Sequence, residues 1–236
     1  MSGPSGHILV IDTATSRVVV ARGGYDGELA DAVSWSAGYR HGETLLPSIE
    51  RLLAPVGGRT GVGAIVVGTG PGAFTGLRVG IATAKGLAHG LGCPIVGIAT
   101  GDALLEAARP EGADGSSAGP GSGGGSNVLL VPAGPSDRVL VRRGEGPVLL
   151  PGGTDPALRE GEQLIAVDLD GRAPGDALDR GRRAHDRLGG ALLQLGAARL
   201  RAGERDDLEH LVPEYVTLPR GVAASVGEVA WSRDPR

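Results

Sequence analysis

Cysteine and aromatic residues are scarce in this chain, and both shortages exclude classes of protein. Cys93 is the only cysteine among 236 residues, which excludes an internal disulfide and a metal site built from several cysteines. A single thiol is typical of a reducing compartment, so we expect a cytoplasmic protein. Aromatic residues make up 3% of the chain, so aliphatic side chains must fill the core and few rings can stack on nucleic-acid bases.

The chain also lacks an excess of positive charge. Its 23 basic and 27 acidic residues give a formal net charge of −4. No global positive field therefore attracts nucleic acid or anionic lipid, and any contact with RNA must be local or shared with a partner. The sequence contains neither a run of about 18 apolar residues nor a basic N-terminus followed by an apolar segment. We expect no membrane insertion and no secretion.

The first half of the chain predicts an α/β lobe. Apolar, β-branched runs predict a three-strand meander, and later apolar patterns alternate between helical and strand periods. This order is typical of a mixed sheet with helices on its faces and not of a Rossmann repeat. The predicted strands cover residues 7–12, 17–24, 28–35, 64–68 and 94–99, and the predicted helices cover 41–54, 75–90 and 101–109.

The second half loosely repeats the first. After a segment rich in glycine and serine, three short strands are predicted, then one more strand and a long helix; these lie at 127–133, 137–143, 147–150, 162–168 and 184–202. Two related lobes follow from this echo. We expect an N-terminal lobe at 1–109, a flexible connector at 110–126, a C-terminal lobe at 127–220 and a loose tail at 221–236.

Residues 68–88, GTGPGAFTGLRVGIATAKGLA, contain more glycine than a helix or strand usually tolerates. A glycine loop that opens a helix can bind phosphate through its backbone N–H groups, with Thr75 as a plausible N-cap. The loop nevertheless lacks both the G-x-x-x-x-G-K-[ST] pattern and the G-x-G-x-x-G pattern. Close approach of another polypeptide is the other explanation.

Small residues recur every four positions along the helix that follows, at Gly76, Gly80, Ala84 and Ala88. Glycine inside a helix costs about 1 kcal/mol relative to alanine, so this ridge needs a compensating contact. Either a partner protein approaches it, or the helix 41–54 of the same chain packs there. If a partner approaches it, Gly80→Arg should abolish binding while the chain stays folded.

At this point four stretches resemble one family of proteins. IDTAT (11–15), HGETLLPSIERLL (41–53), the glycine-rich segment at 68–88 and PIVGI (94–98) resemble the TsaB family, also called YeaZ, of tRNA threonylcarbamoyladenosine synthesis. The resemblance runs to about residue 108, and PEYV (213–216) is similar to the family's C-terminal Pro-x-Tyr motif. Where the family often has an Asp-Ala-Arg segment, this chain reads VPAGPSDR.

The resemblance implies an actin-like, Hsp70-like and sugar-kinase-like (ASKHA) fold, with two lobes that each contain a mixed sheet flanked by helices. It also implies a subunit that binds no cofactor and has no catalytic residues. Such a subunit is a partner and activator of TsaD, which forms N6-threonylcarbamoyladenosine next to the anticodon of tRNAs reading codons that begin with A. The implied partners are TsaD in a heterodimer and the ATPase TsaE in a larger complex, with tRNA contacted indirectly, a homodimer possible in isolation, and no membrane.

The same resemblance supplies a test for metal. TsaD-like chains carry a His-x-x-x-His pair of metal ligands just after the strand that corresponds to PIVGI. Those positions here are Thr100 and Leu104. Leucine has no donor atom and threonine alone is a poor ligand, so we expect no catalytic metal. A metallopeptidase would need ligands that this chain lacks.

Family heterodimers pair their N-terminal lobes through the helices that correspond to 41–54 and 75–90. The resemblance therefore implies a partner interface on this helix pair. Its candidate residues are Leu45, Leu46, Ile49, Leu53, Phe74, Gly76, Leu77, Arg78, Gly80, Ile81 and Ala84.

A small actin-fold ATPase or kinase is the alternative function. It would use Asp12, at the end of the first strand, together with the glycine loop at 68–76. A structural role for Asp12 and a helix-start role for His41 are the simpler interpretations. Lys85, the only lysine, has two open interpretations: a surface position, or a contact with the partner. The arginine-rich segment at 179–187 also contains acidic residues, so it predicts the solvent-exposed start of a helix.

Overall fold

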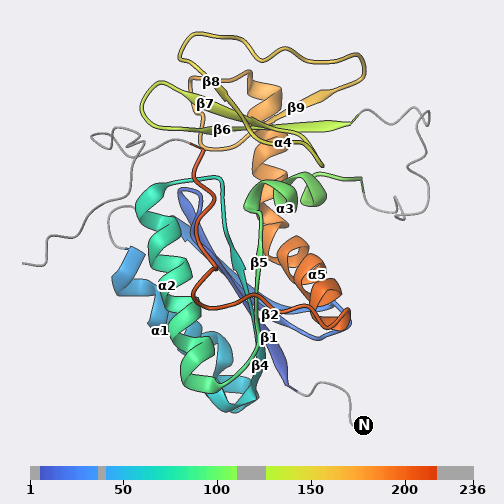
Figure 1. The fold of residues 1–236 in the computed structure, drawn as a ribbon. Helices are drawn as coiled ribbons and strands as arrows, with labels where there is room; N and C mark the ends of the chain where they lie inside the picture. The colour runs from blue at the N-terminus through green and yellow to red at the C-terminus, as the bar shows by residue number, and fades with distance from the viewer. Residues whose placement is uncertain (1–5, 37–40, 111–125, 217–236) are drawn as a thin grey trace, which may run out of the picture.

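The computed structural model describes residues 6–36, 41–110 and 126–216. Two sheets lie at opposite ends of the molecule, with helices around and between them (Figure 1). The first sheet has five strands and the second has four. The predicted α/β architecture with two lobes is confirmed. Within the described residues, no helix is both long enough and apolar enough to cross a membrane.

The first sheet has the strand order β3-β2-β1-β4-β5. Its antiparallel meander consists of β1 (His7–Asp12), β2 (Arg17–Gly23) and β3 (Leu29–Ser36). β4 (Val62–Gly68) pairs parallel with β1, and β5 (Ile95–Ile98) pairs parallel with β4. β1 and β4 are central strands buried on both faces, which explains their continuous apolar runs.

Helices cover both faces of the first sheet (Figure 1). α1 (His41–Leu53) and α2 (Phe74–Leu91) pack on one face, and two short 3-10 turns at Ala54–Val56 and Gly58–Gly61 follow α1. Alternate residues of each strand point to the opposite face, where the core includes Ile8, Val10, Val19, Ala21, Ala64 and Val66.

The second sheet has the strand order β8-β7-β6-β9. Its strands are β6 (Asn127–Pro132), β7 (Arg138–Val141), β8 (Val148–Leu150) and β9 (Gln163–Ala166). β6, β7 and β8 form an antiparallel meander, and β9 pairs parallel with β6. Its four strands therefore repeat the order and directions of the first four strands of the other sheet, which confirms the internal echo.

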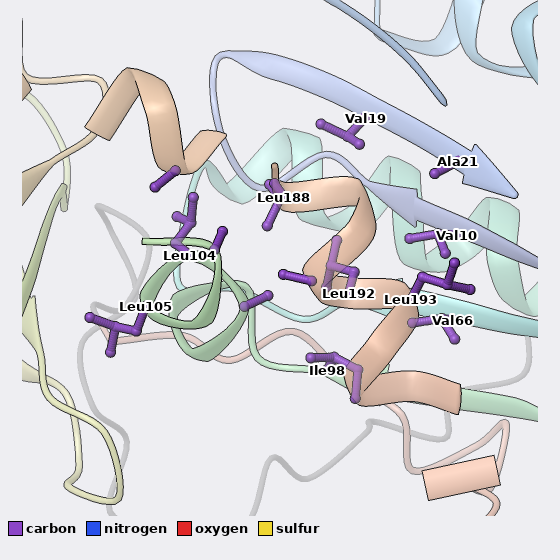
Figure 2. Close-up of a cluster of buried hydrophobic side chains, with 14 of the residues drawn as sticks. Val10, Val19, Ala21, Val66, Ile98, Leu104, Leu105, Leu188, Leu192 and Leu193 are labelled. Carbon is purple, nitrogen blue, oxygen red and sulfur yellow. The ribbon is translucent and has the colours of Figure 1, made fainter. Parts of the chain in front are cut away.

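Helix α5 (Leu188–Arg201) leaves the second lobe and packs on the first sheet. Figure 2 shows Leu192 and Leu193 of α5 against Val10 and Val66 of the central strands. Gly196 lies so close to Val66 that an added Cβ would overlap it. α3 (Thr100–Ala107) lies between the lobes and contacts β6, α4 and α5 (Figure 1).

The segment 206–216 also returns to the first lobe. The Asp206 N–H donates to the Ile95 carbonyl (2.9 Å), and Asp206 in turn accepts a hydrogen bond from the Gly97 N–H (2.6 Å). Leu211 is buried in the core beneath α1 and α2. The predicted C-terminal lobe at 127–220 therefore includes α5 and a segment whose contacts are with the first sheet. Most of the predicted connector and all of the predicted loose tail lie outside the described residues.

Two details of the helices differ from the sequence prediction. The single helix expected at 184–202 is two helices, α4 (Gly175–Asp186) and α5. The arginine-rich run at 179–187 is thus the second half of α4 and not a helix start. α2 begins at Phe74 with Ala73 as its N-cap and no side-chain cap, so Thr75 is inside the helix and does not cap it.

Candidate docking face and interlobe cleft

The glycine-rich segment packs around the turn between β1 and β2. A Cβ added to Gly68 would overlap the Asp12 carboxylate, and one added to Gly72 would overlap the Ala14 carbonyl. The Ala14 carbonyl also accepts a hydrogen bond from the Ala73 N–H (2.7 Å). These glycines are explained by close approach of the chain to itself, since larger residues would separate the two segments.

The small-residue ridge of α2 is also filled by its own chain. Gly76, Gly80, Ala84 and Ala88 are all buried, and a Cβ on Gly80 would overlap the Thr13 side chain. The Thr13 hydroxyl donates to the Gly76 carbonyl (2.7 Å). The ridge therefore packs within the molecule: Gly76 and Gly80 contact Thr13 of the β1–β2 turn, and Ala84 and Ala88 lie in the core of the first sheet, so the ridge is not packed chiefly against α1. This packing contradicts the expectation that Gly80→Arg leaves the chain folded, because the larger side chain has no space.

Most of the predicted interface residues face the core. Leu46 is 49% exposed, and Phe74 and Arg78 also reach solvent. The others cannot offer their side chains to a partner without rearrangement, since they are buried within the first lobe; they are Leu45, Ile49, Leu53, Gly76, Leu77, Gly80, Ile81 and Ala84.

Phe74, Arg78 and Tyr215 form a surface cluster at the start of α2, which we call the aromatic–arginine cluster. The Phe74 and Tyr215 rings have centroids 5.1 Å apart, and the Arg78 guanidinium lies 3.8 Å from the Phe74 centroid. Arg78 Nε donates to the Tyr215 hydroxyl (3.1 Å). Phe74 is the only phenylalanine of the chain, and it is placed at the surface and not in the core.

The segment 206–216 holds Tyr215 in this cluster. The Glu214 N–H donates to the Thr69 carbonyl (2.8 Å), and Lys85 Nζ donates to the Leu211 carbonyl (3.3 Å). Lys85 thus contacts its own chain, which neither of its two earlier interpretations included. The PEYV motif was recognised in the sequence, but its position beside α2 was not, because 137 residues separate Tyr215 from Arg78.

A second stripe of small residues lies on the outer face of α2. Ala82, Gly86 and Gly90 are exposed at four-residue spacing, and a Cβ on either glycine would meet no atom within 4 Å. Together with the aromatic–arginine cluster and Leu46, this stripe makes up what we call the docking face. Small residues allow another backbone to approach a helix closely, and aromatic and arginine side chains dominate the binding energy of many interfaces.

Asp12 is fully buried, and both oxygens of its carboxyl group accept hydrogen bonds from the chain itself. The Thr100 hydroxyl donates to one oxygen (2.6 Å) and the Ala14 N–H donates to the other (3.0 Å). Burial raises the pKa of Asp12 to about 6, although both hydrogen bonds act in the opposite direction. The side chain does not line the cleft between the lobes. This position favours a structural role over the ATPase alternative.

Thr100 and Leu104, the two positions that the sequence resemblance singled out as a test for metal, are both buried. Leu104 is 1% exposed and lies in the core shared by the lobes, and the Thr100 hydroxyl is engaged with Asp12. Neither side chain offers an open ligand position at this place in the fold. In the part of the chain that the structure describes, no three histidine, cysteine or acidic side chains form a metal-binding group.

A cleft of about 630 Å³ separates the lobes. One wall comes from the β1–β2 turn and the start of α2, and the other from the β6–β7 turn and Asp168. The described lining contains the carboxylates of Asp137 and Asp168 but no lysine or arginine. Polyphosphates are usually held by cationic side chains or a metal, so this lining does not favour a nucleotide on its own.

Comparisons with known proteins agree with the sequence resemblance. Residues 35–137 match the family model of TsaD, described as tRNA N6-adenosine threonylcarbamoyltransferase. An uncharacterized protein of Mycobacterium leprae is 42% identical over 102 residues, which cover 41% of this chain and 28% of that protein. The tRNA threonylcarbamoyladenosine biosynthesis protein TsaB of Escherichia coli is 38% identical over 95 residues, which cover 40% of each protein. The chain therefore matches less than half the length of these relatives.

The structural comparison extends over most of the chain. YeaZ from Pseudomonas aeruginosa superimposes with a TM-score of 0.64 at 24% identity, covering 89% of this chain and 100% of that one. At this identity the likeness shows the fold alone, which agrees with the predicted arrangement of two lobes that each contain a mixed sheet. The chain thus has the fold of YeaZ, and about 40% of it is similar in sequence to TsaB (YeaZ) family proteins.

Proposed function

We propose that this protein is a non-catalytic partner and activator of a TsaD-type transferase. It would act in the formation of N6-threonylcarbamoyladenosine next to the anticodon of tRNAs reading codons that begin with A. The observation that carries the proposal is the similarity of its N-terminal lobe to a protein named for this biosynthesis. The match to the TsaD family model supports a partner built on the same lobe.

Three features support a role without independent catalysis. Leu104 replaces a metal-ligand position and lies in the core. Asp12 is bonded to Thr100 and Ala14 and is remote from solvent. The cleft has no cationic side chain among its described lining residues. Phosphoryl transfer depends on such charges to stabilise the transition state, so a transferase or kinase reaction would require groups from another subunit.

The docking face is the proposed contact with TsaD. It offers the aromatic–arginine cluster and the bare stripe on the outer face of α2, together with exposed Leu46 on α1 of the same lobe. The ATPase TsaE and the tRNA would then bind the heterodimer of this chain and TsaD, and this chain would contact the tRNA only indirectly. A homodimer of the isolated protein through the same face, and a cytoplasmic location, belong to the same proposal.

The activity test combines the protein with TsaD and TsaE from the same organism. Modified tRNA is measured with ATP and an activated threonylcarbamoyl donor present, with and without this chain. We expect the yield to rise severalfold or more when the chain is added, and the chain alone to give no product. Equal yields in its absence, or turnover of ATP or tRNA by the isolated chain, would contradict the proposal.

The docking test uses two matched arginine variants. Arg78→Glu removes the contacts with Phe74 and Tyr215, so we expect about a tenfold or greater loss of affinity for TsaD. Arg182→Glu changes an exposed arginine of α4, on the other lobe, and should leave the affinity within twofold. Titration calorimetry measures both. Equal effects of the two variants would place the contact elsewhere.

A further inference from the structure

The β1–β2 turn is connected to the second lobe through three consecutive residues. The Thr15 hydroxyl contacts His185 Nε2 of α4 (2.6 Å). The Ser16 N–H and hydroxyl both donate to the carboxylate of Asp168 (2.6 and 2.5 Å). Arg17 donates to the carboxylate of Asp186 at the end of α4 (2.8 Å).

These contacts lie at the cleft, since Thr15 and Asp168 are both among its lining residues. Elsewhere the lobes are joined by a continuous apolar core, in which residues of α3 and α5 meet strands of both sheets. The lobes are therefore joined in two ways. Apolar packing joins them through the shared core, and hydrogen bonds of the β1–β2 turn join them across the cleft. Asp168 has a φ of 58°, a left-handed conformation that non-glycine residues seldom adopt. Such a conformation persists where surrounding contacts determine it, and Asp168 is fixed by Ser16.

His185 has a defined protonation in this arrangement. Assigning the Thr15 hydroxyl proton to the Arg17 carbonyl (2.9 Å) makes the Thr15 oxygen the acceptor of a hydrogen bond from His185 Nε2–H. The proton of the neutral ring is then on Nε2, and Nδ1 is buried without a partner among the described residues. His185 is only 5% exposed.

We propose that Thr15, Ser16 and Arg17 form an interlobe clamp that fixes the width of the cleft, and that protonation of His185 releases it. A proton on Nδ1 would create a buried cation whose new N–H has no acceptor, which is a costly state. The imidazolium would also lie close to Arg17, the clamp residue that follows Ser16. Movement of α4 together with the preceding segment that carries Asp168, away from the turn, would return the ring to solvent and break all three contacts.

The charges that face His185 set the direction of the pH effect. Burial lowers the pKa of His185, and the positive charge of Arg17 lowers it further, whereas Asp168 and Asp186 act in the opposite direction. Because the closed form disfavours the proton, the clamp is intact at pH values above the ordinary histidine pKa of 6.5. It weakens as the pH falls through the lowered pKa of the closed form.

The Ser16 amide is a direct reporter, because its hydrogen bond crosses the cleft to Asp168. Its protection factor is measured by hydrogen exchange and NMR between pH 8 and pH 5, with the Val20 amide in the middle of β2 as internal reference. We expect Ser16 protection to fall by up to about tenfold per pH unit between the ordinary histidine pKa of 6.5 and the lowered pKa of the closed form, because one proton is taken up on opening in that range, and to level off below it. Val20 protection should stay constant over the same range.

Two variants separate the clamp from general effects of pH. His185→Gln keeps a donor near Thr15 but cannot titrate, so Ser16 protection should become independent of pH. Asp168→Asn tolerates the left-handed backbone but removes the charge, so Ser16 protection should fall by about tenfold or more at pH 8. A His185→Gln profile equal to that of the wild type would overturn the role of the histidine.

The width of the cleft is measured separately. Spin labels are placed at exposed Thr75 and Ser136, on opposite lobes, after Cys93→Ala has removed the native thiol. In the wild type we expect a narrow distance distribution at pH 8 that broadens at pH 5, and in Asp168→Asn a broad distribution at both. A narrow distribution in Asp168→Asn at both values would overturn the clamp. These measurements need no TsaD, so their result is independent of the proposed function.

Discussion

The two faces of α2 carry nearly the same residues for opposite reasons. On the inner face, the space beside Gly80 is filled by the Thr13 side chain, which also donates a hydrogen bond to the Gly76 carbonyl. On the outer face, Gly86 and Gly90 meet nothing within 4 Å. On the inner face, the absence of a side chain is required for close packing. On the outer face, it leaves open space and only lowers the stability of the helix. A repeat of small residues thus identifies a surface made for close approach, but not which molecule approaches it.

The inner stripe of α2 is the easier of the two to see in the sequence, yet it is not part of the proposed docking face. The inner stripe has four small residues, Gly76, Gly80, Ala84 and Ala88, whereas the outer one has three, Ala82, Gly86 and Gly90, and the next position in its row is Arg78. Intramolecular packing gives a regular pattern because a helix must bury one continuous face. An interface that also contacts water part of the time needs no such regularity.

Replacement of glycine by arginine on each face should give the largest contrast. Gly80→Arg places a long side chain where even a Cβ overlaps Thr13, so we expect about 4 kcal/mol or more of destabilisation and no folded protein at 37 °C. Gly86→Arg is exposed and should change the free energy of unfolding by less than about 1 kcal/mol. It should still prevent docking on TsaD. Urea denaturation and co-purification distinguish the two, and a stable, non-binding Gly80→Arg would reverse our assignment of the faces.

The stability of the buried region beside the inner face of α2 should also depend on pH, because the carboxyl group of Asp12 is buried there. Its folded-state pKa of about 6 exceeds the ordinary value of 3.8, so the folded form holds its proton more tightly than the unfolded form. Stability from this group is present below pH 3.8 and is lost as the pH rises to 6. The loss is about 3 kcal/mol from the two-unit shift.

Asp12→Asn should remove this loss, so the difference in unfolding free energy between wild type and variant should change in the variant's favour from pH 4 to pH 7. Urea denaturation at several pH values measures it. The same change at exposed Asp170 is the control and should leave the pH dependence of the wild type in place. Parallel profiles for wild type and Asp12→Asn would mean that the carboxyl is not desolvated as described.

The smallest effect is expected from Gly86→Ala on the outer face. Alanine adds no overlap there and restricts the unfolded chain, so the variant should be more stable by about 0.5–1 kcal/mol. Thermal denaturation detects a change of this size. If Gly86→Ala were destabilising, the outer face would be packed against something and would not be open.

Much of the fold was predictable because its elements have strong local patterns. The meander strands alternate or are fully apolar, and α1 has an apolar stripe of helical period. α4 was missed, since its buried face consists of Ala177, Gly181, Ala184 and His185 instead of large apolar residues. Gly181 packs against the Ala166 carbonyl, so the contact that fixes α4 depends on the absence of a side chain.

The candidate site was predictable only in part for a different reason. Periodicity shows that Leu45 and Ile49 share a face of α1 with each other, but not that this face is turned inward. Phe74 and Arg78 were selected from the resemblance, and both are exposed at least in part. The contacts of Tyr215 with these residues, and of Thr15 with His185, join segments far apart in the chain. No local pattern encodes such pairs.

The return of α5 to the first sheet has a consequence for synthesis of the protein on the ribosome. The strands that carry Val10 and Val66 are made early, but Leu192 and Leu193, which cover them, emerge late. A nascent chain must keep one apolar face of its first sheet uncovered until the residues of α5 have left the exit tunnel. Chains stalled or cleaved before α5 would expose that face, a hazard for aggregation in the cell.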